Sequence, residues 1–375
     1  MRLIWYLVIF FIAYGSLYPF NFDLTRDMPA EPVDWLLNWQ QRTIKSDLIA
    51  NVLLFIPYGF FGALQVQQKG RRYPLLAIAL MIVSGVFFAL LLQVLQFYLP
   101  SRVPHAADAV INSLGILIGV SAAAYTNSQR INRLIPNRMR FELSPAMLLL
   151  VLWLGLQFFP YIPVFESTQF DKSISGLFAS IWSMESWLKG TLYWLIFYAV
   201  FYQVVSTRSH IVFLLIISVF VIVIKMAMYR SHIGWSEITA LPFALILHRY
   251  LAINSKVVLL AIASILLMVW ENVFPLQWSS QMGSIQWLPF KGVLQGSTWY
   301  NLSSLFETSL IMGSVAYFVG RWVKSYFAGA LLLVLLTLII NIIQLFIEHK
   351  QTDITSVIMA LIIAILMVQL AENNK

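Results

Sequence analysis

Twelve stretches of the chain are apolar over a length that suits a membrane-crossing helix, and short polar segments separate them. The runs without a charge are 3–22, 48–68, 73–101, 109–129, 143–165, 209–224, 325–347 and 354–371. The runs that carry a charge are 187–205, 233–248, 257–276 and 297–320. Because a helix needs about 20 apolar residues to cross a bilayer, the pattern predicts an all-α, polytopic integral membrane helix bundle with about 12 transmembrane helices.

Composition excludes a soluble fold. Hydrophobic residues make up 60% of the 375 positions and charged residues only 11%, whereas soluble domains carry roughly 25% charged residues. The formal charge of +8 does not indicate a nucleic-acid partner, since no basic stretch is interleaved with stacking aromatics. The chain has no cysteine, so disulfides and thiolate metal sites are excluded.

The distribution of lysine and arginine predicts the orientation. With the N-terminus in the cytoplasm, 14 of the 24 basic residues fall inside, mostly in short connections. They are Arg2, Lys69, Arg71, Arg72, Arg130, Arg133, Arg138, Arg140, Arg208, Arg249, Lys256, Arg321, Lys324 and Lys375. Because short cytoplasmic loops are rich in Lys and Arg, we expect a multi-pass protein with both termini in the cytoplasm.

Segments near the two ends of the chain resemble each other at a nearly constant spacing. "SLYPFNF" (16–22) aligns with "NVFPLQW" (272–278), "NVLLFIPYGFFG" (51–62) with "LSSLFETSLIMG" (302–313), and "VLQFYLPSRVPHAAD" (94–108) with "IIQLFIEHKQTDITS" (342–356). The displacements are 256, 251 and 248 residues. A weaker middle copy puts Lys225 at the position of Gln96 and Glu237 at that of Asp108.

These correspondences predict three parallel four-helix repeats, with units at 1–130, 141–252 and 256–375. Each unit has an even number of helices, so all three keep the same orientation in the membrane, as in transporters built from parallel repeats. A carrier of six plus six helices is the alternative; its halves would repeat at roughly half of the twelve-helix length, and no match is found there.

The stretch "LQFYLPSRVPHAADAVINSLGILIG" (95–119) concentrates polar side chains between two apolar runs. Helical spacing puts Asp108, Asn112, Gly115 and Gly119 on one face, and the two glycines form a small-xxx-small pair that allows close helix packing in lipid. We expect the turn between the two helices to bring further polar groups to this face at the outer membrane boundary. The candidate cluster is Gln93, Gln96, Arg102, His105, Asp108 and Asn112, completed by Asp47 and Asn51 on the second span.

The first unit resembles the VanZ-like family. "NVLLFIPYGFFG" looks like its N-x-x-x-F-x-P-x-G segment, Gln93 and Gln96 stand at its E-x-x-Q pair, and "SRVPHAADAVINSLGILIG" (101–119) is similar to its R-x-x-D-x-x-D-x-x-x-N-x-x-G-x-x-x-G run. Two positions depart, because Gln93 replaces the acid of the pair and His105 replaces the first aspartate. The third unit keeps the counterparts Gln344, Lys350 and Asp353. The resemblance implies a bacterial inner-membrane protein of the cell envelope with an effect on susceptibility to the glycopeptide teicoplanin.

The sequence leaves the role of the polar cluster open. In a structural interpretation, Arg102 pairs with Asp108 and the amides lock the helices together. In a functional one, the cluster holds the anionic headgroup of a membrane lipid or a lipid-linked envelope precursor, because ionisable groups at spans often mark sites. A membrane-embedded enzyme with Asp108 as base, and an accessory subunit of an exopolysaccharide or export machine that contacts other membrane proteins, remain alternatives.

Other candidates are weaker. No two of the five histidines share the i, i+3 or i, i+4 spacing of a metal pair, so we expect neither a metal site nor a cofactor. Lys225 and Glu237 form a candidate ion pair across a hairpin, and Glu307, deep in its span, is a candidate proton carrier.

Overall fold

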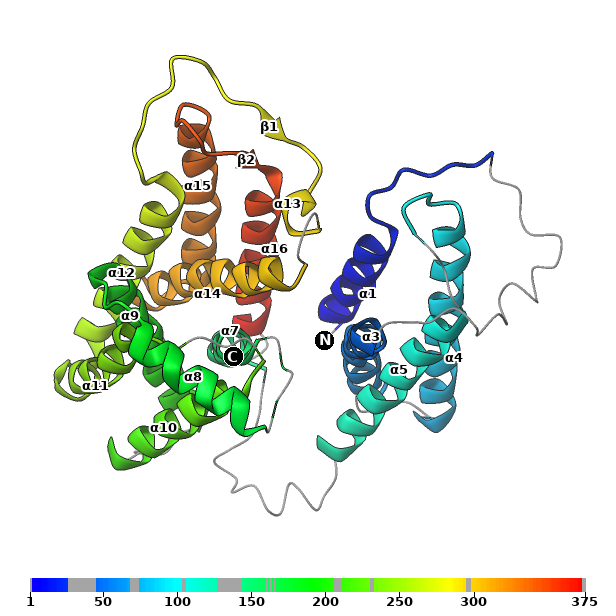
Figure 1. The fold of residues 1–375 in the computed structure, drawn as a ribbon, viewed down its shortest axis with the longest axis horizontal. Helices are drawn as coiled ribbons and strands as arrows, with labels where there is room; N and C mark the ends of the chain where they lie inside the picture. Colours follow the sequence, from blue (N-terminus) through cyan, green and yellow to red (C-terminus); the bar gives the residue numbers. More distant parts are fainter. Residues whose placement is uncertain are drawn as a thin grey trace. The chain divides into compact units, whose positions relative to one another are not determined.

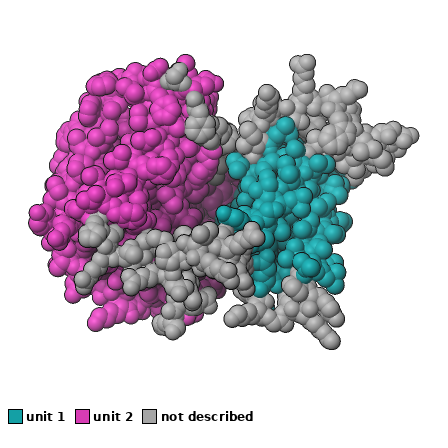
Figure 2. All heavy atoms as spheres, turned by 90° about the horizontal axis from the view of Figure 1, so that it is seen from below, with its two compact units in different colours: residues 1–137 teal, residues 138–375 magenta. Residues whose placement is uncertain are grey.

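The computed structural model describes residues 2–25, 45–67, 74–102, 106–126, 143–159, 161, 164, 166–205, 211–229, 233–294 and 298–372. Contacts divide the chain into two compact units, Met1–Asn137 and Arg138–Lys375 (Figure 2). The predicted division into three repeats at 1–130, 141–252 and 256–375 stays a prediction.

The first unit contains four described helices (Figure 1). They are α1 (Arg2–Leu17), α3 (Lys45–Val66), α4 (Pro74–Phe97) and α5 (Ala106–Thr126). Their core includes Ile12, Phe55, Tyr58, Met81 and Ile116, all buried. Apolar residues also face outward, and on α4 the side chain of Leu75 is 81% exposed. Exposed apolar surface of this extent suits a helix that faces lipid.

The second unit is also helical in its described part. Its helices are α7 (Pro145–Phe158), α8 (Ser167–Ala179), α9 (Met184–Val205), α10 (Ile211–Ala227), α11 (Trp235–Tyr250), α12 (Ile253–Val273), α13 (Lys291–Leu294), α14 (Thr298–Trp322), α15 (Tyr326–Gln344) and α16 (Ile354–Glu372). Two short strands, β1 (Ile285–Gln286) and β2 (Thr352–Asp353), pair in parallel next to the ends of α15 and α16 (Figure 1). The described part of the chain is otherwise helical, in agreement with the predicted all-α class.

Local sequence explains where several helices begin. Ser144 caps α7 by accepting a hydrogen bond from the backbone N–H of Met147, and Pro145 occupies the first turn, where its missing N–H does no harm. Ser325 caps α15 in the same way through the N–H of Ala328. In the core behind α7, the ring of Trp153 stacks on Phe197 of α9 with centroids 4.3 Å apart.

Five of the described helices are long and apolar enough to cross a membrane: 75–97, 108–125, 253–273, 326–344 and 354–372. Others, such as α7 with 14 residues and α10 with 17, are apolar but short of the roughly 20 residues that a span takes. The membrane-helix character of the chain is therefore established, and the count of twelve spans stays a prediction.

Candidate functional site

Arg102 binds the end of α1. Its Nε donates to the carbonyl oxygen of Tyr18 at 3.3 Å, and its Nη2 donates to the carbonyls of Gly15 and Tyr18, both at 3.3 Å. The last carbonyls of a helix have no partner within the helix, so a cation there satisfies them and interacts favourably with the helix dipole. The side chain nevertheless stays exposed.

Gln96 acts on the same helix end. Its Nε2 donates to the carbonyl oxygen of Ser16 at 2.9 Å, and the backbone N–H of Asp23 donates to the carbonyl of Tyr98 at 2.7 Å. The connection after α4 is thus fastened to the end of α1 by two side chains and one backbone bond. We call Gln96 and Arg102 with these bonds the helix-end clamp.

The structural interpretation of Arg102 changes accordingly. No ion pair joins Arg102 to Asp108 in the described part of the first unit, and the guanidinium is instead occupied by backbone carbonyls. Carbonyl acceptors leave no trace in the side-chain sequence, so spacing alone pointed to the nearest carboxylate. We expected this arginine to join α4 to α5. It instead joins the connection between those two helices to the end of α1.

The remaining cluster residues lie on α3, α4 and α5. Gln93 and Asn112 are buried, at 3% and 4% exposure, and Asp108 and Asn51 are partly buried. The Oδ1 of Asn112 has no hydrogen-bond partner among the groups that the structure describes. His105 lies outside the described residues, as does the side chain of Asp47 in the first turn of α3.

The glycines of the predicted face do hold two helices close together. A Cβ at Gly115 would overlap the carbonyl of Val52, and one at Gly119 would overlap that of Ile56, both on α3. On α3 itself, a Cβ at Gly59 would meet the carbonyl of Ile116 on α5. Backbones in direct contact need small residues on both sides. This packing fixes where Asp108 and Asn112 stand relative to α3.

The counterparts near the C-terminus make a second clamp. Gln344 Nε2 donates to the carbonyl of Asn272 at 3.0 Å, and Lys350 Nζ donates to that of Glu271 at 3.2 Å, both in the last turn of α12. Asp353 has a different role, since its Oδ1 accepts from the N–H and the hydroxyl of Thr355 and so caps the start of α16. Lys350 is partly buried, unlike Arg102.

In the middle of the chain the corresponding lysine is neutralised. Lys225 Nζ lies 2.7 Å from Glu237 Oε1 and donates to Gln157 Oε1 at 3.2 Å. The predicted ion pair across the hairpin between α10 and α11 is therefore confirmed. Gln157 lies near the end of α7, so this lysine also reaches a helix end earlier in the chain, through a side chain rather than a carbonyl.

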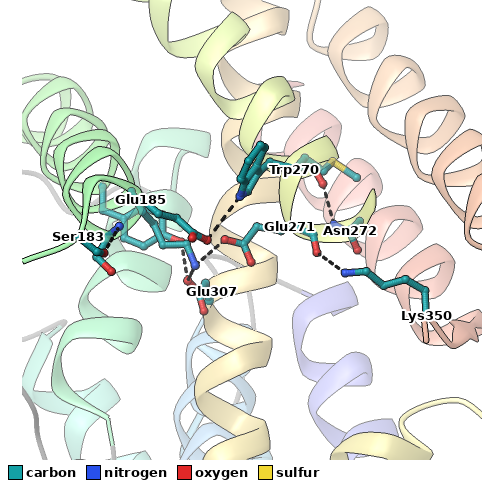
Figure 3. A network of polar contacts seen from close by, with 11 residues as sticks. Ser183, Glu185, Trp270, Glu271, Asn272, Glu307 and Lys350 are labelled. Atoms are coloured by element: carbon teal, nitrogen blue, oxygen red, sulfur yellow. Dashed lines mark hydrogen bonds and ion pairs between the residues drawn. The ribbon is translucent and has the colours of Figure 1, made fainter. Parts of the chain in front are cut away.

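A charged network in the second unit was not predicted from the sequence (Figure 3). Lys189 Nζ on α9 lies 2.6 Å from Glu271 Oε1 on α12 and 3.0 Å from Glu307 Oε1 on α14. The hydroxyl of Tyr193, one turn further along α9, donates to Glu307 Oε1 at 2.7 Å. The three charged side chains are only 25–32% exposed.

In the sequence these charges stand apart, in the apolar runs 187–205, 257–276 and 297–320. Their pairing depends on contacts between helices far apart in the chain, and Lys189 and Glu307 are separated by 118 positions. The signal that could have found them is the presence of one cation and two acids in otherwise apolar runs, because such groups rarely stay unpaired in a membrane.

The described residues thus define a helical membrane protein whose polar groups gather at helix ends and between packed helices. Residues 3–127 match the VanZ/LLP1 family, so the first unit is a VanZ-type domain. This match includes Arg102, Asp108, Asn112 and the three glycines of the close contact. No curated protein and no solved structure matches the chain.

Proposed function

We propose that this VanZ-type protein binds the anionic headgroup of an envelope lipid or lipid-linked precursor beside Arg102. The observation that carries the proposal is an exposed guanidinium whose orientation is already fixed by the carbonyls of Gly15 and Tyr18. The location belongs to the same proposal: the bacterial inner membrane, with both termini in the cytoplasm and the cluster at the outer boundary. An effect on glycopeptide susceptibility would follow from binding such a precursor.

The chemistry of the guanidinium supports a second ligand. Arginine has five N–H donors and stays charged, and the bonds to α1 use Nε and Nη2. The carbonyls are neutral, and the helix end contributes only about half a negative charge, so a positive charge remains. The two N–H groups of Nη1 remain as donors to phosphate oxygens, and a guanidinium held in one orientation loses little freedom when it binds.

The finer architecture is part of the proposal: three copies of one four-helix unit. Three backbone bonds at corresponding places support it. Asp23 N–H donates to Tyr98, Val164 to Ala227 and Ser279 to Phe346, at 2.7, 2.8 and 2.8 Å. The donors are displaced by 141 and 256 positions from the first copy (164 − 23 and 279 − 23), and the acceptors by 129 and 248 (227 − 98 and 346 − 98).

The clamps follow the same displacements. Gln96 binds the carbonyl of Ser16, and Gln344 binds that of Asn272. Gln344 stands 248 positions after Gln96, and Asn272 stands 256 positions after Ser16. Arg102 binds the carbonyl of Gly15, and Lys350 binds that of Glu271. The two cations are again 248 positions apart, and the two carbonyls 256. Independent side chains would not reproduce both bonds at the displacements that the sequence comparison predicts.

Differences among the copies favour the first as the binding site. Lys225 of the middle copy is paired with Glu237, and Lys350 of the third is partly buried. The position of Asp108 is Ser356 in the third copy, where its hydroxyl is bound by Asn341 Nδ2 at 2.8 Å. Arg102 is the clamp cation that combines exposure with a location in the VanZ-type domain.

The test is lipid copurification with three variants. Purified wild-type protein and the Arg102→Ala, Gln96→Leu and Lys350→Ala variants are incubated with vesicles of phosphatidylethanolamine and phosphatidylglycerol, and retained lipid is measured by native mass spectrometry. We expect Arg102→Ala to lose anionic lipid selectively. Gln96→Leu removes a bond of the helix-end clamp and leaves the charge of the protein unchanged, and Lys350→Ala removes the corresponding cation of the third copy. Both variants should therefore retain anionic lipid.

Equal retention of phosphatidylglycerol by Arg102→Ala and wild type would overturn the proposal. Each measurement is normalised to folded protein by thermal unfolding, which separates loss of the site from loss of the fold. Should Arg102→Ala fail to fold, Arg102→Lys keeps the charge and must retain anionic lipid more strongly than Arg102→Gln.

A further inference from the structure

Helix α8 exposes two stripes of opposite character. Ile174 and Phe178, one turn apart, are 43% and 72% exposed. Lys172 and Ser175 are also exposed, and helical spacing puts them beside this stripe. The exposed Asp171, three residues before Ile174, stands at the N-terminal end of the stripe. A helix in water gains nothing by exposing large apolar side chains, and one buried in lipid would not expose its charged ones.

The third side of α8 is bound to the end of a lipid-facing helix. Gln169 and Ser173, 8% and 4% exposed, donate to the carbonyls of Met228 and Met226 at 2.9 and 3.0 Å. These carbonyls stand at the end of α10, whose exposed residues are almost all apolar, among them Ile216 and Phe220 at 60% and 63%. The polar groups of α8 thus satisfy helix-end carbonyls where α10 would leave the hydrocarbon.

The segment after α8 is fastened as well. The Oγ of Ser180 accepts from the N–H of Trp235 at 3.0 Å, and the N–H of Ser183 donates to Ser236 Oγ at 2.9 Å. Between them Ile181 is 91% exposed. These two bonds, together with those of Gln169 and Ser173, hold α8 between the end of α10 and the start of α11, with its apolar stripe and Ile181 exposed.

From these contacts we infer that α8 lies in the plane of the membrane surface, with Ile174, Phe178 and Ile181 in the acyl-chain boundary and Lys172 and Ser175 in water. Its 13 residues extend about 20 Å, too short for a hydrocarbon core of about 30 Å. Separate apolar and charged faces are the property of interfacial helices. Helix α8 is hydrogen-bonded to the end of α10, whose exposed side chains are apolar, and this neighbour identifies lipid as the occupant of the stripe.

The absence of native cysteine allows a direct test in the full chain. Single variants Ile174→Cys, Phe178→Cys, Lys172→Cys and Ser175→Cys are nitroxide-labelled and reconstituted in vesicles of phosphatidylethanolamine and phosphatidylglycerol. Electron paramagnetic resonance measures collision with oxygen, which enriches in lipid, and with a water-soluble nickel chelate. We expect an oxygen-to-nickel ratio several-fold higher at 174 and 178 than at 172 and 175.

Two results would overturn the inference. Equal nickel access at all four labels would put α8 in water, and labels at 174 and 178 that neither reagent reaches would mean that protein covers the stripe. Ile181→Cys supplies a position where a label cannot disturb packing, because the native side chain is almost fully exposed. Its ratio must match that of 174 and 178.

Discussion

At the scale of single residues, Lys189 is the charge on which the second unit depends most. Its ammonium pairs with both Glu271 and Glu307, which are about two-thirds buried. Removing one partner of a buried ion pair leaves an uncompensated charge and costs 3–5 kcal/mol, whereas replacing all partners together is often neutral. The remaining exposure lowers this cost, so we expect Lys189→Met to destabilise the protein by about 2 kcal/mol.

The same network permits a rescue experiment. The triple variant Lys189→Met, Glu271→Gln, Glu307→Gln leaves no unpaired charge in the network. We expect it to regain most of the lost thermal stability in detergent. Glu185→Gln is the matched control, because Glu185 is exposed and accepts only a long bond of 3.4 Å from Trp270 Nε1. If the triple variant unfolds as early as the single one, the charges do not act as a unit.

At the scale of elements, close contact between α3 and α5 depends on glycine. A Cβ at Gly119 would overlap the carbonyl of Ile56 and stand 2.7 Å from the N of Phe60, both backbone atoms of α3. Backbone cannot move aside as a flexible side chain does, so Gly119→Ala must separate the helices. We expect a loss of about 3 kcal/mol, at the upper end for overpacking, measured by thermal unfolding.

Gly15 provides the control for this substitution within the same unit. A Cβ there meets nothing within 4 Å, and alanine is favoured over glycine in a helix interior by about 1 kcal/mol. Gly15→Ala should therefore leave the unit unchanged or slightly more stable. A comparable loss in both variants would show that the effect belongs to glycine in general rather than to the contact between α3 and α5.

The elements also show what the sequence could and could not predict. Helices α4, α5 and α15 begin and end within four residues of the predicted runs 73–101, 109–129 and 325–347, because apolar length is a local signal. The glycine face was predicted for the same reason. Helix α8 was missed, since it is short and half polar, and the partners of Arg102 and Lys189 depend on tertiary contacts that periodicity does not contain.

At the scale of the whole molecule, three parallel copies predict that the connection after the third helix of each copy lies on the same side of the membrane. Ser101, Tyr229 and Glu348 each lie in the connection after the third helix of a proposed copy, and all three are exposed. Between Ser101 and Tyr229 the chain passes through α5, α7, α9 and α10, and between Tyr229 and Glu348 through α11, α12, α14 and α15. If α8 does not cross, four crossings separate each pair.

An even number of crossings returns the chain to the same side. We therefore expect Ser101→Cys, Tyr229→Cys and Glu348→Cys to react with a membrane-impermeant maleimide from one side only, and from the outer side because the positive-inside distribution puts both termini in the cytoplasm. The natural lack of cysteine removes any background. A label on Tyr229→Cys from the opposite side would require an odd count between the first and middle copies, which would contradict both the parallel repeat and an α8 that stays at the surface.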